Sequence, residues 1–400
     1  MAGLSLCLVV VVGVVAWRLA DSDPYVAPRP QEQKSPVDAT GASRTLDAFQ
    51  RAVRDRDRGA AATLAPQGDT ATTRLLTAIV ANAAAIPVQG VRLRYLDENQ
   101  PARSDGTWGA AVTVTWRFAG FDRAPAQSEV TFRFRRDGDR VAIAGVGGGD
   151  ERTPLWLAVP LQVERYPDVL VLDAGDDPSK IVARARRAVA DVRAVLPQWR
   201  TGLVVEVPPD SEALDAALDA EPGAYAGIAA VTSASDGSTA PDSPIHVFLN
   251  PSIFGRLGDT GAQVVMSHEA VHVATKAPNS AMPQWLLEGF ADYVALRRVD
   301  LPFSVTASQI IRQVRRQGPP KALPGPAEFE SSDRHLGAAY EAAWLACVVL
   351  ADHGGEDALV DFYAAVDGGA DERAALKEHF GWTEGELVAA WRQRLTDLAG

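Results

Sequence analysis

Hydrophobic residues recur at helical spacing near the start of the folded part of the chain. Leu46, Phe49 and Val53 are three or four positions apart, which is typical of an amphipathic helix packed against a core. Ser43 precedes this run and is expected to cap the helix. A second helical stretch is predicted over residues 72–85. The first folded region therefore begins with helices.

The hydrophobic period changes to two beyond residue 87, which indicates β-strands. Two alternating series are expected to face one core: Val112, Val114, Trp116 and Phe118, then Val130, Phe132 and Phe134. Helices followed by long hairpins predict an α+β domain over residues 43–150. This order resembles the cone-shaped fold of the nuclear transport factor and ketosteroid isomerase superfamily. Some of these cones carry catalytic Asp and Tyr residues, but we interpret Tyr95 and Asp97 as ordinary strand and turn residues, so a non-catalytic spacer or recognition module is expected.

Strand and helix patterns alternate after a glycine-rich hinge at residues 145–154. Four apolar runs have the length of strands: "DVLVLDAG", "GLVVEVP", "YAGIAAVTS" and "PIHVFLNP". Helices are expected over residues 177–196 and 211–218, and again over 336–355 and the segments that follow. This pattern predicts a second domain over residues 151–400, with a mixed sheet and a helical lobe.

The first residues of the chain predict a membrane segment. Residues 2–17, "AGLSLCLVVVVGVVAW", are apolar and uncharged, with a length between that of a signal-peptide core and a full membrane span. Cleavage after Ala16 is the alternative, but Trp17 makes that site poor. We expect a transmembrane or signal-anchor segment over residues 1–20 and a disordered, proline-rich linker over 21–42. The folded domains are then expected outside the cytoplasm, on a single-pass protein of the cell membrane.

The composition limits the partners of the protein. The chain has 39 basic and 51 acidic residues, a formal net charge of -12, which would repel a phosphate backbone. Nucleic acid is therefore not expected as a partner. Cys7 and Cys347 lie in unrelated apolar segments, so no disulfide is expected.

The stretch "MSHEAVHVAT", residues 266–275, contains the candidate chemistry of the chain. Thr260 and Gln263 are spaced as a capping box, which predicts a helix through this segment. His268 and His272 are then about 40° apart around the helix axis and about 6 Å apart along it, so both imidazoles project from one face. Glu269 is about a quarter turn away, beside a metal held by the histidines but not a ligand of it. The alternative is a pair of core histidines.

A zinc site needs a third protein ligand in addition to the two histidines. One known extension places Gly and His shortly after the motif, where this chain has Thr275 and Pro278 instead. The other common solution is a glutamate on the next helix, and "PQWLLEGFADYVALRR" provides Glu288 as the predicted third ligand. Asp292 follows four residues later on the same face. It is expected to accept a hydrogen bond from a ligand imidazole.

These two segments resemble the motifs of the gluzincin metallopeptidases, and more narrowly those of their peptidase MA-like group. "HEAVH" and "WLLEGFADYVA" match both motifs in order and at suitable separation, and the resemblance covers residues 155–395. It implies a thermolysin-like domain in which His268, His272 and Glu288 bind Zn²⁺. It also implies that Glu269 is the general base and that Asp292 supports the first histidine. "IHVFLNP" is expected to be the edge strand above the cleft, where a peptide substrate adds itself by main-chain hydrogen bonding.

Tyr340 lies in the predicted helix where this group of peptidases carries a tyrosine near the metal. It either donates a hydrogen bond to the tetrahedral oxyanion or packs in a helical bundle. The expected function is zinc-dependent hydrolysis of peptide bonds by a membrane-anchored protease. The alternative is a non-catalytic zinc-containing protein that binds or organises components of the cell envelope.

Overall fold

The structure is a computed structural model that describes residues 37–149, 151–175, 177–330 and 336–400. The described chain has an α+β fold, as expected, and residues 39–400 form one compact unit. The expected anchor over residues 1–20, and the linker up to residue 36, lie outside the described residues. Among the helices that the structure does describe, none is long and apolar enough to cross a membrane.

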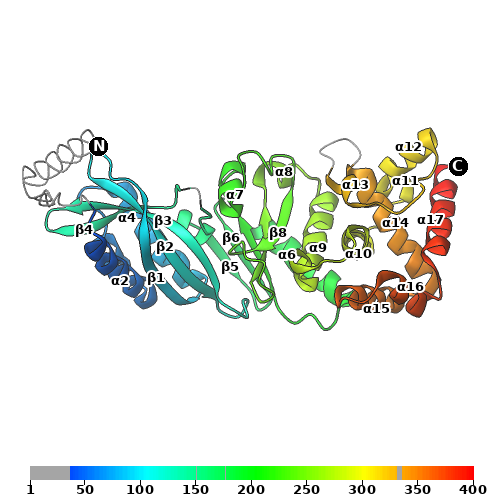
Figure 1. The fold of residues 1–400 in the computed structure, drawn as a ribbon, viewed down its shortest axis with the longest axis horizontal. Helices are drawn as coiled ribbons and strands as arrows, with labels where there is room; N and C mark the ends of the chain where they lie inside the picture. The colour runs from blue at the N-terminus through cyan, green and yellow to red at the C-terminus, as the bar shows by residue number, and fades with distance from the viewer. Residues whose placement is uncertain (1–36, 150, 176, 331–335) are drawn as a thin grey trace, which may run out of the picture. The chain divides into compact units, whose positions relative to one another are not determined.

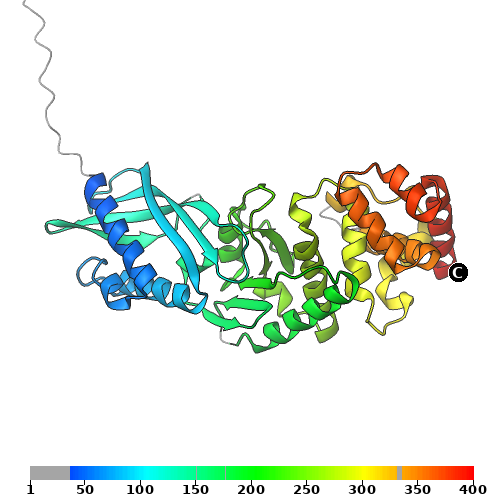
Figure 2. The same cartoon turned by 90° about the horizontal axis from the view of Figure 1, so that it is seen from below.

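The first sheet is a four-stranded antiparallel meander in the order β1-β2-β3-β4. Its strands are β1 (Val88–Gln100), β2 (Thr107–Phe118), β3 (Ala126–Asp137) and β4 (Arg140–Val146). Three helices precede it: α2 (Ala39–Asp55), α3 (Arg58–Ala62) and α4 (Thr70–Ala85). α2 packs against β1 and β4, and α4 also contacts both of these strands (Figures 1 and 2).

The predicted alternation in β2 and β3 is confirmed. All seven alternating side chains are buried, with Trp116 and Phe118 each only 1% exposed. Ser43 was wrongly predicted as a helix cap, because α2 begins four residues earlier at Ala39. The Ser43 hydroxyl instead donates a hydrogen bond to the carbonyl of Ala39, inside the helix. A serine within a helix satisfies its hydroxyl on the preceding turn, so its presence alone does not identify the first residue.

The second sheet is mixed and has five strands in the order β5-β6-β7-β9-β8. Its strands are β5 (Gln162–Arg165), β6 (Val169–Asp173), β7 (Leu203–Val207), β8 (Ala230–Ala234) and β9 (Ile245–Leu249). β6, β7 and β9 are parallel, whereas β5 and β8 pair antiparallel at the two edges. The expectation that "IHVFLNP" forms the edge strand is therefore wrong. β9 lies inside the sheet and β8 is the edge, because β8 pairs antiparallel with β9 on the side opposite β7.

Helices cover the second sheet, and its central strands β6 and β7 are apolar apart from Asp173 and Glu206. Every residue of β6 and β7 is buried, as expected for strands covered on both faces. The helices of this region are α5 (Leu155–Ala158), α6 (Ser179–Val195), α7 (Ser211–Leu218), α8 (Pro251–Phe254) and α9 (Asp259–Thr275). α6 contacts β6 and β7, and α9 contacts α6, β8 and β9. α9 is thereby held against the antiparallel edge of the sheet.

The rest of the described chain folds into helices, coloured from yellow-green to red in Figure 1. They are η1 (Ala277–Asn279), α10 (Gln284–Leu296), α11 (Phe303–Thr306), α12 (Ser308–Gln317), α13 (Pro326–Glu330), α14 (Leu336–Gly354), α15 (Glu356–Asp367), α16 (Glu372–Phe380) and α17 (Glu384–Ala399). α14 contacts α10, α12, α15 and α17, and so lies at the centre of this region. The indole of Trp391 on α17 donates to the carbonyl of Ala342 on α14, which ties the last helix to the core.

Gly289 allows α10 to approach α14 closely. A Cβ atom at this position would lie 2.4 Å from the carbonyl oxygen of Ala343 and 3.1 Å from Sγ of Cys347. The first distance involves backbone of a buried helix, so the contact cannot be relieved by rotating a side chain. Glu288 directly precedes Gly289 on α10. The close approach of α10 to α14 therefore also fixes the part of α10 that carries the Glu288 carboxylate.

We expect Gly289→Ala to lower the free energy of unfolding by roughly 1–3 kcal/mol, because the added methyl group overpacks the α10–α14 contact. Gly261→Ala is the matched control, since a Cβ atom there meets only Leu257 Cβ at 3.9 Å. That change should be neutral or stabilising by up to about 1 kcal/mol, as for an exposed helical glycine. Urea unfolding of both variants measures the difference. Equal effects would contradict the close packing.

His246 on β9 interacts with a buried carboxylate from each of the two sheet regions. Its Nδ1 lies 2.7 Å from Oε1 of Glu206 on β7, and its Nε2 lies 3.1 Å from Oδ1 of Asp122, in the segment between β2 and β3. The side chain of His246 is only 1% exposed. Burial by itself would lower the pKa of the imidazole, but the hydrogen bonds and charges of Asp122 and Glu206 outweigh it and raise the pKa to about 9. The Arg152 guanidinium is the nearby basic group, and it interacts electrostatically with Glu206.

The raised pKa of His246 predicts a loss of stability at alkaline pH. An unfolded histidine has a pKa near 6.5, so the stabilisation is complete below about pH 6.5 and is lost as the pH rises through about 9. The free energy of unfolding should fall by roughly 3 kcal/mol across this interval. Urea unfolding at several pH values measures the fall, which should be absent in His246→Gln. If the free energy of unfolding of His246→Gln fell equally with pH, the loss of stability could not be due to His246.

Candidate metal centre

α9 and α10 supply the side chains of the candidate site. α9 begins at Asp259 with Gly258 as its N-cap, and no side chain caps it. The predicted capping box of Thr260 and Gln263 is therefore wrong. The Gln263 amide instead donates to the carbonyl of Arg184 on α6 and to the hydroxyl of Ser267. Tertiary packing of α9 against α6 has replaced a local cap.

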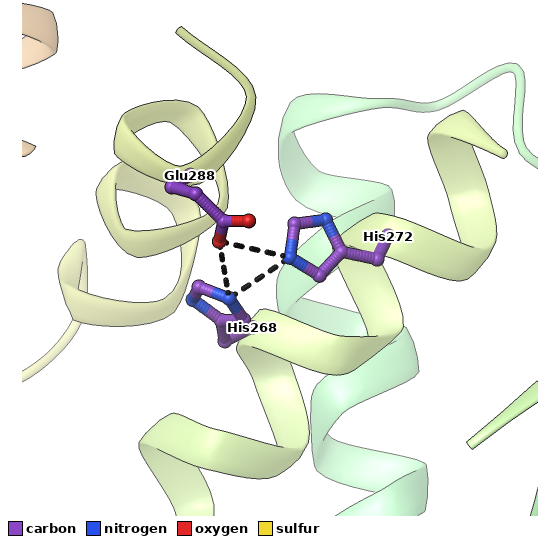
Figure 3. Close-up of side chains that lie close together, drawn as sticks. All are labelled: His268, His272 and Glu288. Carbon is purple, nitrogen blue, oxygen red and sulfur yellow. Dashed lines mark hydrogen bonds and ion pairs between the residues drawn. The ribbon is translucent and has the colours of Figure 1, made fainter. Parts of the chain in front are cut away.

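His268, His272 and Glu288 converge, as Figure 3 shows. The Nε2 atoms of the two histidines are 2.9 Å apart, and Glu288 Oε2 lies 3.2 Å from the first and 3.3 Å from the second. A triangle with these sides has a circumradius of about 1.8 Å, so a point about 1 Å from its plane is about 2 Å from all three atoms. That is the bond length of zinc to imidazole nitrogen and carboxylate oxygen. The geometry of the three donors thus fits one metal ion.

Asp292 lies behind the first histidine. Its Oδ1 is 2.7 Å from His268 Nδ1, so the ring donates a hydrogen bond to the carboxylate and keeps Nε2 directed at the common point. Glu288 and Asp292 are one helical turn apart on α10, as the sequence predicts, and both contact His268. An outer carboxylate of this kind fixes the orientation and tautomer of a metal-binding imidazole.

The site concentrates negative charge away from water. The side chains of Glu288 and Asp292 are only 12% and 16% exposed, and Glu269 is buried nearby on α9. Burial would lower the pKa of His268, but the charges of Asp292 and Glu288 raise it well above its usual value. Burial would likewise raise the pKa of Glu288, but hydrogen bonds and charges from His268 and His272 hold it far below its usual range. The surroundings therefore favour positive charge at the common point, which a divalent cation would supply.

Tyr340 borders the same site. Its ring centroid is 6.1 Å from that of His268, and burial together with the charges of Glu288, Asp292 and Glu269 raises the pKa of its hydroxyl. The phenol therefore keeps its proton and can donate it to a hydrogen bond. Tyr340 also packs edge to face against Phe329 on α13, with centroids 5.3 Å apart. The position of Tyr340 is compatible with a hydrogen bond to an oxyanion, and its contact with Phe329 is compatible with a packing role.

The structure adds one contact that the sequence does not reveal. The hydroxyl of Thr232 on β8 donates to Oε2 of Glu269 at 2.5 Å. An isolated threonine in a strand carries no pattern that would single it out. Only the packing of β8 against α9 brings these two residues together.

No protein-family model matches the chain, and no curated protein is significantly similar to it in sequence.

Asp292→Asn should weaken the affinity for a divalent metal by roughly 10- to 100-fold, because the amide cannot accept the imidazole proton with the strength of a carboxylate. Zn²⁺ binding by competition with a chromophoric chelator measures the change. Asp300→Asn removes the same charge from an exposed position just beyond α10 and serves as the control. Equal affinities of the two variants would show that Asp292 does not support the site.

Proposed function

We propose that this protein is a zinc metallopeptidase of the gluzincin type. The convergence of His268 Nε2, His272 Nε2 and Glu288 Oε2 on one point is the observation that carries the proposal. Glu269 directly follows His268 on α9. The donors are two imidazoles and one carboxylate, a set that suits catalytic zinc and leaves a position open for water or substrate. The motif resemblance in the sequence supports the same class independently of the geometry.

His268, His272 and Glu288 are the residues that would hold the ion, with Asp292 orienting the first of them. Zinc bound there supplies Lewis acidity, which makes a water more acidic and polarises a peptide carbonyl. The rest of the reaction is carried by side chains of the protein.

Glu269 acts as the general base and general acid. Its carboxylate takes a proton from the attacking water and later delivers that proton to the leaving amine. It is buried, so the proton is held in a site with little competing solvent. Tyr340 keeps its hydroxyl proton and donates a hydrogen bond to the oxygen that gains negative charge in the tetrahedral intermediate.

The substrate is an extended peptide that adds to the edge of the second sheet. This edge is β8, the antiparallel strand that contacts α9, and it takes the place that the sequence assigned to β9. A free strand edge offers main-chain donors and acceptors to an added strand. We further propose that residues 1–20 anchor the protein in the cell membrane with residues 43–400 outside the cytoplasm. The region over residues 43–150 then serves as a cone-like recognition or spacer module.

The competing function is a zinc-containing binding or scaffold protein without catalysis. A structural zinc site closes its fourth position and has no need for an adjacent carboxylate. Glu269 stands next to His268 and carries a dedicated hydrogen bond from Thr232, which favours the enzyme.

Glu269→Gln should retain one zinc ion per chain but lower peptide hydrolysis by roughly 10²–10⁴-fold, because the amide cannot accept the proton of the attacking water. Elemental analysis of the purified protein and cleavage of a mixed peptide library measure the two effects. Glu378→Gln changes an exposed carboxylate of α16 in the same way and is the control.

Two outcomes would oppose the proposal. Undiminished cleavage by Glu269→Gln would remove the assigned base. Stoichiometric zinc in the wild-type protein without cleavage of any library peptide would favour the scaffold.

A further inference from the structure

Thr232 is the one residue of β8 whose side chain is hydrogen-bonded to the predicted catalytic base. Its hydroxyl lies 2.5 Å from Oε2 of Glu269 and 3.3 Å from the main-chain oxygen of the same residue. The first distance is that of a short hydrogen bond to a charged carboxylate. Val231 on the same strand packs instead with Leu214 and Phe248, on the opposite face of the sheet. Side-chain alternation along β8 thus directs Thr232 toward α9.

The main chain of Thr232 faces the open edge of the sheet. Just outside the ends of β8, the carbonyl of Ala229 accepts from the Asn250 N–H, and the N–H of Ser235 donates to the carbonyl of Pro244. In an antiparallel ladder, hydrogen-bonded pairs alternate with non-hydrogen-bonded pairs. With the register of β8 and β9, residues 231 and 233 therefore bond to β9, and residue 232 presents its N–H and C=O away from β9.

At Ala234, the next residue of β8 that faces outward, the main-chain carbonyl already has hydrogen-bond donors. The carbonyl of Ala234 accepts hydrogen bonds from the guanidinium of Arg152 and from the N–H of Gly237. An added peptide strand would therefore meet the main chain of β8 at Ala230 and Thr232. Thr232 thus faces the open edge with its main chain and contacts Glu269 with its side chain.

We propose that Thr232 is a positioning residue that couples substrate docking on β8 to the carboxylate of Glu269. Its main chain pairs with the peptide, and its hydroxyl holds Oε2 of Glu269, which leaves Oε1 to exchange the proton. This inference rests on the proposed peptidase function. It adds a residue outside both sequence motifs to the machinery of the reaction.

Thr232 can affect the reaction because the carboxylate of a glutamate otherwise rotates freely about its last side-chain bond. A carboxylate turns about its terminal torsion with little preference, since that torsion is broad and roughly two-fold. The Thr232 hydroxyl removes this freedom for one oxygen, so the other is held in one orientation before substrate arrives. Holding a base in its reactive orientation affects the chemical step more than the binding of the ground state.

The test compares Thr232→Val with Thr232→Ser. Valine keeps the β-branched shape and removes the hydroxyl, whereas serine keeps the hydroxyl. We expect kcat of Thr232→Val to fall by roughly 10- to 100-fold with KM changed by less than about threefold, and Thr232→Ser to recover most of kcat. Ser233→Ala is the control, because it removes a hydroxyl from the opposite face of the same strand and should leave kcat unchanged.

A second readout needs neither activity nor metal. In the metal-free protein, Thr232→Val should lower the urea midpoint of unfolding, because a buried carboxylate loses its donor. In a Glu269→Ala background the same change should leave the midpoint unaltered or raise it. Equal shifts in the two backgrounds would mean that the hydroxyl does not serve Glu269, and would overturn the inference.

The kinetic outcomes separate this inference from the proposed function. Full kcat in Thr232→Val, with an active wild-type protein, overturns the role of Thr232 alone. A larger effect on KM than on kcat also overturns it, since Thr232 would then act only in binding. A wild-type protein that hydrolyses no peptide overturns the peptidase proposal itself, whatever the midpoints show.

Discussion

Burial of negative charge is the constraint on which the site depends. Glu288 and Asp292 lie within 3.2 Å of the His268 ring nitrogens in surroundings that exclude most water, and Glu269 is buried on the same helix as that histidine. Unpaired carboxylates in such surroundings cost several kcal/mol each, so they persist only with a positive partner. The raised pKa of His268 reflects the same demand. A divalent cation at the common point of the three donor atoms would supply that positive partner.

The fold serves this constraint by holding two helices against a sheet edge. α9 is fixed between α6 and β8, and α10 is fixed against α14 at a position where only glycine fits, Gly289. The three donor atoms therefore lie 2.9–3.3 Å from each other. The same arrangement packs the edge strand β8 against α9, where the Thr232 hydroxyl donates a hydrogen bond to the carboxylate of Glu269.

Long, strongly periodic segments were predicted well, and local signals of helix starts were not. The alternating strands β2 and β3, the helix α6 and the helix α14 agree with the patterns in the sequence. Ser43 and the pair Thr260–Gln263 were misread as caps, because their side chains bond to the preceding turn or to another helix instead. Periodicity reflects burial over many residues, whereas one cap contributes little and packing easily replaces it.

The sequence by itself determined which residues of α9 and α10 share a face, because helical geometry converts a spacing of four into a common direction. His268, His272, Glu288 and Asp292 follow from that rule. Tertiary structure decided the order of the strands, which put β8 rather than β9 at the edge, and it decided the partner of Glu269. Strand order and long-range contacts depend on how separate elements pack, and no spacing along the chain encodes that.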